Sequence, residues 1–264
     1  MSYRDKAYKY VMVKVEGGIA RITNNRPKAL NAVNLEMMRE QKEVYAGIAA
    51  DPEVKVLITT GNDRAYCAGG DLKLFANFSV KEAREFIDEV IDMASLVYNM
   101  GKPTIAMIAG ICVGGGLESA LNHDFRIAAD NAVFALPEIN VGIYPGGGAT
   151  QRLPQLIPLS KAKELVFLGE TFDAQAALDW GIVNRVAPLA DLEKETMEIA
   201  VKLLQKPAFS LRLAKESLNA AWSCSVEKGL QLETHGWAMC YGTYDQREGM
   251  AAFIEKRSPV FKGE

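Results

Sequence analysis

The sequence is poor in the side chains that hold metal ions or form disulfides. It has only two histidines, His123 and His235, and four cysteines, none of which are spaced as CxxC. Zinc sites and disulfide frameworks need such residues clustered at short, regular spacings. The sequence therefore predicts no metal site and no disulfide scaffold, and a Ser/His/Asp triad has few histidines to draw on.

Long apolar runs and a surplus of basic charge are also missing. The longest apolar run, at 104–113, is too short to cross a bilayer, and residues 1–16 lack the apolar segment of a signal peptide. The formal net charge is −3 and the pI is about 5.6, so no general attraction to nucleic acid is expected. We therefore expect a cytoplasmic protein with no nucleic-acid partner and no membrane partner.

Phosphate-binding glycine loops are absent as well. The run Gly114-Gly115-Gly116 is followed by Leu-Glu, and the glycines at 146–148 are followed by Ala-Thr-Gln. Neither segment matches the GxGxxG loop that binds dinucleotides or the GxxxxGK[ST] loop that binds nucleoside triphosphates. Nucleotide triphosphate chemistry is therefore disfavoured.

The order of apolar patterns along the 264 residues indicates an α/β protein. A hairpin is expected at 10–15 and 19–23, and further strands at 54–60, 104–109, 125–129 and 132–135, with a glycine-rich loop at 61–70. Helices are expected at 35–48, at 80–100 and from about Gly115, then at 161–168, 191–205, 208–221, 226–241 and 246–256. Beyond residue 160 the only strand expected is at 182–186. This pattern predicts a largely parallel sheet with crossover helices, followed by a helical C-terminal region.

Two glutamates lie in apolar surroundings at places where the chain turns. Glu118 follows the triple glycine on the first turn of a predicted helix, and Glu138 follows a proline and precedes an apolar segment. A carboxylate in a water-poor pocket has a raised pKa and can act as acid or base near neutral pH. Each also has a structural interpretation, as an ordinary helix-start glutamate and as an exposed turn acid, and both interpretations stay open at this point.

Two glycine loops could supply backbone donors beside these acids. The triple glycine and the CAGGDL segment at 67–72 each follow a predicted strand and precede a predicted helix, with Asp71 as a candidate N-cap. Free N–H groups at a helix start stabilise a developing negative charge. The alternatives are a tight strand-to-helix packing contact and a plain N-cap. Nearby, His123 is expected to be structural, and Asp124 and Arg126 to form an ion pair or cap.

Six segments, in order, together resemble the enoyl-CoA hydratase (crotonase) family over nearly the whole chain. They are RPKALNA (26–32), CAGGDL (67–72), AGICVGGGLESAL (109–121), FALPEINVGIYPGGGATQRLP (134–154), GIVNRV (181–186) and FIEKRSPVFKG (253–263). The resemblance implies a spiral of ββα units over residues 1–200, which carries a CoA-thioester site. It also implies that residues 201–264 form a helical region for trimerisation, which gives a homotrimer or a dimer of trimers.

The resemblance also implies a role for particular residues. Gly70 and Gly115 match the backbone donors of the oxyanion hole, although the family more often has alanine or serine at the position of Gly70. Glu118 matches the acid that aligns and deprotonates water, and Glu138 the acid that handles the proton at the α-carbon. The residues implied to bind the CoA thioester are Lys28, Ala29, Leu30, Ala68, Asp71, Leu72 and Gly146.

The activity implied is the reversible syn addition of water to a 2-trans-enoyl-CoA, giving a 3-hydroxyacyl-CoA. Neither a metal nor a cofactor is expected, because coenzyme A is part of the substrate. The alternatives are an enoyl-CoA Δ-isomerase, another acyl-CoA lyase of the family, or a non-catalytic scaffold that binds acyl-CoA or RNA. The presence of both glutamates favours the hydratase, while acyl chain length is not predicted.

Overall fold

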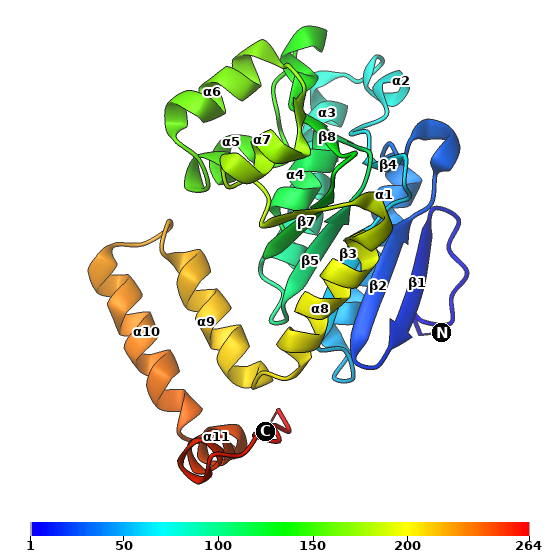
Figure 1. Ribbon diagram of the computed structural model, residues 1–264. Helices are drawn as coiled ribbons and strands as arrows, with labels where there is room; N and C mark the ends of the chain where they lie inside the picture. The colour runs from blue at the N-terminus through cyan, green and yellow to red at the C-terminus, as the bar shows by residue number, and fades with distance from the viewer. Residues whose placement is uncertain (1, 264) are drawn as a thin grey trace.

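The structure, a computed structural model, describes residues 2–263 and contains two β-sheets with helices packed against them (Figure 1). The strands are β1 (Val11–Glu16), β2 (Ile19–Asn24), β3 (Val56–Thr60), β4 (Ala65–Cys67), β5 (Thr104–Ile108), β6 (Ile111–Val113), β7 (Phe125–Ala129), β8 (Val133–Ala135), β9 (Phe172–Asp173) and β10 (Arg185–Ala187). The α-helices are α1 (Leu35–Ala50), α2 (Leu72–Phe75), α3 (Val80–Tyr98), α4 (Gly115–Leu121), α5 (Ala149–Arg152), α6 (Leu159–Leu168), α7 (Ala174–Asp179), α8 (Leu192–Leu204), α9 (Ala208–Ala220), α10 (Val226–Cys240) and α11 (Tyr244–Glu255). Short 3₁₀ helices are η1 (Pro27–Ala29), η2 (Pro137–Val141), η3 (Leu153–Gln155) and η4 (Leu189–Asp191).

The two sheets are built by one repeating chain path. The larger sheet has the order β1-β2-β3-β5-β7-β10, and the smaller has the order β4-β6-β8-β9. Among the strand pairs within residues 2–263, only β1–β2 and β8–β9 are antiparallel. Each of β3, β5 and β7 leads directly into β4, β6 or β8 of the other sheet, and helices then return the chain to the first sheet. The prediction of a largely parallel α/β fold is confirmed, and the repeat is a spiral of ββα units.

The second sheet was not predicted as a separate layer. The prediction of a loop over 61–70 is wrong at residues 65–67, which form β4. No strand was expected where β9 forms, and the strand expected at 182–186 is Arg185–Ala187. Strands this short are too brief to display an alternating pattern. The chain also changes sheets at Gly110, which has a φ of +59° and where a Cβ would lie 2.2 Å from the carbonyl oxygen of Arg64. This glycine divides the apolar run at 104–113 into β5 and β6.

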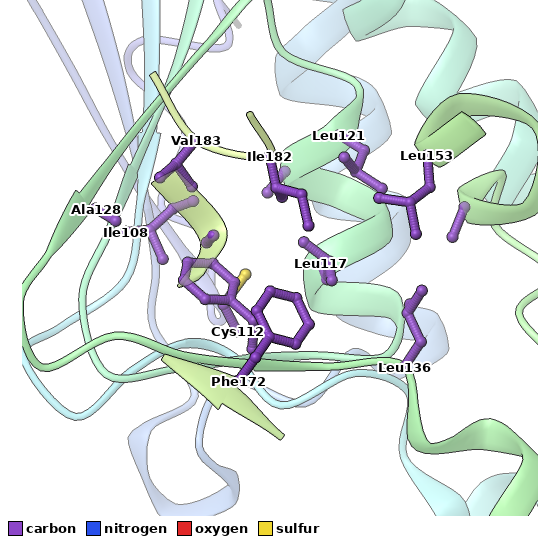
Figure 2. Packing of buried hydrophobic residues seen from close by; sticks show 14 of the residues in the cluster. Ile108, Cys112, Leu117, Leu121, Ala128, Leu136, Leu153, Phe172, Ile182 and Val183 are labelled. Atoms are coloured by element: carbon purple, nitrogen blue, oxygen red, sulfur yellow. The ribbon is translucent and has the colours of Figure 1, made fainter. Parts of the chain in front are cut away.

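A buried apolar cluster holds α4 between the smaller sheet and the helices that follow it. Figure 2 shows Leu117 and Leu121 of α4 in this cluster, together with Cys112 of β6, Phe172 of β9 and Leu153. Full burial of one leucine side chain stabilises a fold by about 1.5–3 kcal/mol. The packing therefore fixes the position and direction of the short helix that carries Glu118.

The far end of α4 is held by a neutral histidine. His123 Nδ1 lies 3.0 Å from the carbonyl oxygen of Ser119, and its Nε2 lies 2.9 Å from Thr59 Oγ1. Because a carbonyl can only accept, Nδ1 carries the proton and Nε2 accepts from the threonine hydroxyl. Burial lowers the pKa of His123 to about 3, so the ring stays uncharged. The structural role expected for this histidine is confirmed.

The ion pair expected between Asp124 and Arg126 is wrong. Asp124 Oδ2 instead accepts hydrogen bonds from the backbone N–H of Thr104, at 2.8 Å, and from Lys215 Nζ of α9, at 2.9 Å. The buried Arg126 donates to the carbonyl oxygens of Ile182 and His123. Lys215 supplies the missing counter-charge from a distant helix, which sequence proximity could not indicate.

The C-terminal helices α9, α10 and α11 extend away from the sheets, as the orange and red segments in Figure 1 show. Large apolar side chains on these helices and on the turn between α9 and α10 are exposed: Leu218, Trp222, Trp237, Phe253 and Ile254 are between 65% and 83% accessible. In contrast, Ile199 and Ala200 of α8 are buried against the larger sheet. The domain boundary at residue 200 falls within α8 and stays a prediction. None of the helices within residues 2–263 is long and apolar enough to span a bilayer.

Candidate active site

The triple glycine brings the start of α4 close to the end of β4. Gly114 has φ 54° and ψ −127°, a conformation for which glycine is strongly favoured. A Cβ at Gly116 would lie 2.1 Å from the carbonyl oxygen of Cys67, so only glycine allows this approach. The result is a helix N-terminus, with Glu118 on its first turn, that touches the loop after β4.

The second glycine loop lies against the first. A Cβ built on Gly69 would lie 3.3 Å from the backbone N of Gly115, and one built on Gly115 would lie 3.7 Å from the backbone N of Gly70. Within residues 2–263, the N–H groups of Gly70 and Gly115 donate no hydrogen bond to the protein. The structure thus brings the two predicted donors together, both with a free N–H group. Such a pair can bind an oxygen that gains negative charge.

Glu118 is buried and held by backbone donors. It is 6% exposed, and its Oε1 accepts hydrogen bonds from the N–H groups of Gly147, at 2.8 Å, and Ala149, at 3.1 Å. Burial raises the pKa of Glu118 above its ordinary value, and these hydrogen bonds and the charge of Arg152 offset only part of the rise. Its carboxylate is therefore fixed in place yet more basic than one in water.

Glu138 lies in η2, next to the triple glycine. A Cβ built on Gly114 would lie 3.1 Å from Glu138 Oε1, so the side chain reaches the turn before α4. Its Oε2 is buried and, within the described residues, has no hydrogen-bond partner. Burial, together with the nearby charge of Glu118, raises the pKa of Glu138 to about 7. Glu138 can therefore gain or lose a proton near neutral pH.

A small cavity of about 30 Å³ opens beside Glu118. Its walls come from the glycine loops and α4, and from the apolar side of α3 and the neighbouring α1. The lining residues are Gly115, Glu118, Ser119, Asn122, Gly147, Tyr45, Val90, Met93, Ala94 and Val97. The site thus combines two acids and two free donors with an apolar hollow.

The loops predicted to bind the CoA thioester run side by side. Lys28 and Ala29 lie in η1, Leu30 has a left-handed conformation, and the N–H of Ala68 donates to the carbonyl oxygen of Leu30 at 3.0 Å. The N–H of Val33 then donates to Gly69 O at 2.8 Å. These bonds join Lys28, Ala29, Leu30 and Ala68 into one surface beside the N–H of Gly70.

The other residues predicted to bind the CoA thioester are Asp71, Leu72 and Gly146, and they lie in different surroundings. Asp71 caps α2 by accepting from the N–H of Lys73, as expected, and also pairs with Arg26 at 2.8 Å. Leu72 is 54% exposed beside it. Gly146 lies exposed on a different loop, next to Ile87 of α3. Asp71 therefore joins the two loops predicted to bind the CoA thioester, whereas Gly146 belongs to the loop whose N–H groups bind Glu118.

Sequence reasoning missed Gly147, Ala149 and Arg152. The first two position Glu118 through their N–H groups, and the guanidinium of Arg152 lies 4.3 Å above the ring of Tyr98. The available signal was the glycine run at 146–148 just before a helix. Within residues 2–263 there is also no group of three or more His, Cys, Asp and Glu side chains placed to hold a metal ion.

Comparison with known proteins gives consistent results along the whole chain. The sequence model of the enoyl-CoA hydratase/isomerase family matches residues 14–264. A crotonyl-CoA hydratase of Syntrophomonas wolfei is 39% identical over 97% of this chain and 98% of its own length. A short-chain-enoyl-CoA hydratase of Clostridium acetobutylicum is 37% identical over 94% of this chain and 95% of its own.

Solved structures of the same family are also similar to this chain. An enoyl-CoA hydratase from Bacillus anthracis superposes with a TM-score of 0.93 at 36% identity, covering 97% of this chain and 100% of that one. At this identity and coverage, the likeness extends to sequence as well as fold.

Proposed function

The chain belongs to the enoyl-CoA hydratase/isomerase family, and we propose that it is an enoyl-CoA hydratase. The reaction is the reversible syn addition of water to a 2-trans-enoyl-CoA, giving a 3-hydroxyacyl-CoA. One observation carries the assignment: the carboxylates of Glu118 and Glu138, both with raised pKa values, lie beside the turn where the free N–H groups of Gly70 and Gly115 come together. Acid, base and oxyanion stabiliser are the three groups that this reaction needs.

The proposed sequence of bond changes uses each group once. Ionised Glu118 takes a proton from water as the water oxygen forms a bond to the β-carbon. The electron pair of the double bond moves towards the thioester oxygen, which the N–H groups of Gly70 and Gly115 stabilise. Protonated Glu138 then gives its proton to the α-carbon and restores the thioester carbonyl. Removing one oxyanion donor typically costs about 10²–10³ in rate, so these donors are central to the reaction.

This chemistry is complete without a separate cofactor, because coenzyme A enters as part of the substrate. We assign its contacts to the joined loops that carry Lys28, Ala29, Leu30, Ala68, Asp71 and Leu72, with Gly146 on the facing loop. CoA thioesters are made and used inside cells, which supports a cytoplasmic location. No nucleic-acid or membrane partner is proposed.

An isomerase is the main alternative, because moving one proton between two carbons requires a single acid. The hydrogen bonding of Glu118 supports the hydratase. Its carboxylate is fixed by Gly147 and Ala149 while Glu138 Oε2 remains unpartnered among the described residues, so two acids are prepared for different tasks. A non-catalytic scaffold would gain nothing from burying an unpaired carboxyl, which costs folding free energy.

The test is turnover of crotonyl-CoA in ¹⁸O-labelled water, with the product identified by mass spectrometry. A hydratase incorporates one labelled oxygen at the β-carbon. An isomerase instead converts a 3-enoyl-CoA to the 2-enoyl-CoA without incorporating label. Failure to hydrate 2-enoyl-CoA substrates from four to ten carbons would contradict the proposal.

We also propose that the chain forms a trimer or a dimer of trimers through α9, α10 and α11. Exposed apolar surface marks interaction sites, and Leu218 of α9, Trp222 in the turn after α9 and Phe253 of α11 are each at least 67% exposed. Sedimentation equilibrium measures the assembly directly. A mass equal to one chain at micromolar concentration would contradict it.

A further inference from the structure

Arg152 lies near the carboxylate of Glu118 without forming an ion pair with it. It ends α5, the short helix that begins at Ala149, whose N–H donates to Glu118. Within residues 2–263, Glu118 is the carboxylate whose charge acts most on the guanidinium of Arg152, and Arg152 Nε is buried without a hydrogen-bond partner. A buried donor left without a partner costs folding free energy. Stability alone therefore does not account for an arginine at this position.

The side chain of Arg152 packs against the loop that binds Glu118. A Cβ built on Gly148 would lie 3.1 Å from Arg152 Nη1, and the backbone N–H of Arg152 donates to the carbonyl oxygen of Gly148 at 3.0 Å. Gly148 has a φ of +114° and stands between Gly147 and Ala149, the two residues whose N–H groups bind Glu118 Oε1. The direction of these N–H groups therefore depends on the packing of Arg152.

Tyr98, the last residue of α3, gives the guanidinium a second neighbour. The guanidinium carbon lies 4.3 Å above the centroid of the Tyr98 ring. A cation over an aromatic face is attracted by the ring, and more strongly where water is excluded. The carbonyl oxygen of Tyr98 in turn accepts a hydrogen bond from Asn219 Nδ2 of α9, at 3.0 Å. Gly148 and Tyr98 together define the place of this positive charge.

The charges on the far wall around Arg152 have partners of their own. Arg152 lines a cavity of about 420 Å³ together with Arg212, Lys215 and Glu216 of α9. Lys215 pairs with Asp124 at 2.9 Å, and Arg212 lies 3.8 Å from Glu216. The cavity also gives small solutes a route to the guanidinium of Arg152.

Around Glu118 itself, Arg152 is the cation whose charge acts most on the carboxylate within residues 2–263. Glu138 of η2 is the neighbouring acid. Tyr45 of α1 lines the small cavity beside Glu118, but burial raises its pKa to about 12, so it stays neutral. The positive charge of Arg152 therefore opposes both the burial of Glu118 and the negative charge of Glu138.

We propose that Arg152 is a positioning residue for Glu118: its charge keeps the water-activating carboxylate ionised, and its packing keeps the N–H groups of Gly147 and Ala149 directed at that carboxylate. This inference rests on the proposed hydratase function and deepens it, because it adds a residue that acts through Glu118 rather than on the substrate. Hydration requires ionised Glu118, so the acid limb of the pH profile of kcat/KM reports what Arg152 does.

The first experiment compares that profile for crotonyl-CoA in the wild type, Arg152→Gln and Arg152→Lys. Removing the positive charge raises the pKa of Glu118, so the acid limb should move to higher pH in Arg152→Gln. Below the limb, kcat/KM falls about tenfold for each pH unit by which the limb moves. Arg152→Lys keeps the charge and should keep the limb near its wild-type position. Arg212→Gln is the matched control, because Arg212 lines the same cavity but lies on α9, and its limb should equal that of the wild type.

The second experiment uses the cavity. Arg152→Ala removes the guanidinium beside a space of about 420 Å³, so free guanidinium ion, at concentrations far below those that unfold proteins, should restore part of kcat/KM. Urea has a similar shape but no charge and should restore none. Sodium chloride at equal ionic strength corrects for screening.

Folding is checked by circular dichroism. If the alanine variant does not fold, Tyr98→Leu replaces it: without the ring the charge loses its place, and the limb should again move to higher pH. Tyr98→Phe keeps the ring and should leave the limb unchanged.

The two proposals fail in different ways. If the wild-type chain hydrates no 2-enoyl-CoA, the proposed function is wrong. The hydratase assignment stands and the role of Arg152 is overturned if the limb is unmoved in folded Arg152→Gln, or if Arg152→Lys moves it as far. The same conclusion follows if urea restores as much activity as guanidinium, or if neither restores any.

Discussion

Glu118 and Glu138 lie close enough for the charge of one to raise the pKa of the other, yet their hydrogen bonding is opposite. Glu118 Oε1 accepts from two backbone N–H groups, whereas Glu138 Oε2 is buried without a partner in the described part of the chain. Hydrogen bonds to a carboxylate favour its ionised form, and burial without them favours the neutral acid. The arrangement therefore prepares Glu118 as the base and Glu138 as the acid.

This difference predicts a bell-shaped pH profile for kcat/KM. Hydration needs ionised Glu118 and protonated Glu138, so the rate should fall as pH rises through about 7, where Glu138 loses its proton. It should also fall in acid, at a pH above the ordinary glutamate value, because the pKa of Glu118 is raised.

The two directions of the reaction provide the check. Dehydration needs protonated Glu118 and ionised Glu138, so the pair carries one proton in both directions. The pH profiles of hydration and dehydration should therefore fall at the same two pH values. Steady-state rates with crotonyl-CoA and with 3-hydroxybutyryl-CoA, measured from pH 5 to 9, give the comparison. A flat profile through pH 7 would remove Glu138 from the role of acid.

Replacing either carboxyl by an amide should nearly abolish turnover. Glu118→Gln and Glu138→Gln keep the side-chain shape but cannot exchange the proton, and we expect kcat to fall by about 10²–10⁴. Binding of an acyl-CoA product, measured by calorimetry, should persist because neither change alters the loops assigned to CoA. Glu164→Gln on α6 is the control, since Glu164 is exposed and pairs only with Lys161 among the described residues. Equal loss of activity in all three variants would point to a folding effect.

The sequence could predict the helices and strands that have a long pattern of apolar residues. The amphipathic helix expected at 80–100 is α3, which begins with a capping box at Ser79 and Glu82, and the buried strand expected at 54–60 contains β3. The three-residue strands of the second sheet have no such pattern, and their pairing depends on contacts that close only in three dimensions. The change from one sheet to the other at Gly110 was therefore not predicted.

For the candidate site, too, the sequence predicts some features and not others. Glu118, Glu138, Gly70 and Gly115 could be named because they stand in motifs that resemble a family. The hydrogen bonding and packing of these residues could not be predicted, because they depend on residues distant in the sequence. Ala149 donates a hydrogen bond to Glu118 from 31 positions away, and the ring of Phe75 fills the space beside Gly70. Motifs locate reacting groups, whereas burial and packing decide what those groups can do.

The turn at Gly114 should be as important as the acids. Gly114→Ala places a methyl group 3.1 Å from Glu138 Oε1 and strains a backbone with a φ of 54°, which would shift both the acid and the N–H of Gly115. We expect a loss of about 10²–10³ in kcat, comparable to that of one oxyanion donor. Gly142→Ala is the control, because its φ is also positive, at 81°, but a Cβ there meets nothing within 4 Å. Similar activity in both variants would mean that backbone strain alone is responsible.

The raised pKa of Glu138 also predicts a stability cost that depends on pH. Because its pKa is about 7 when folded and near 4.5 for an ordinary glutamate in water, the folded chain binds more protons between these values. Its contribution therefore destabilises the fold progressively as pH rises from about 4.5 to 7, and the full cost remains above that range. Glu138→Gln removes the ionisation, so its melting temperature should exceed that of the wild type at pH 8 and approach it at pH 4.5. Melting curves at both values measure this, and an equal difference at the two pH values would show that the carboxyl is not desolvated as the structure indicates.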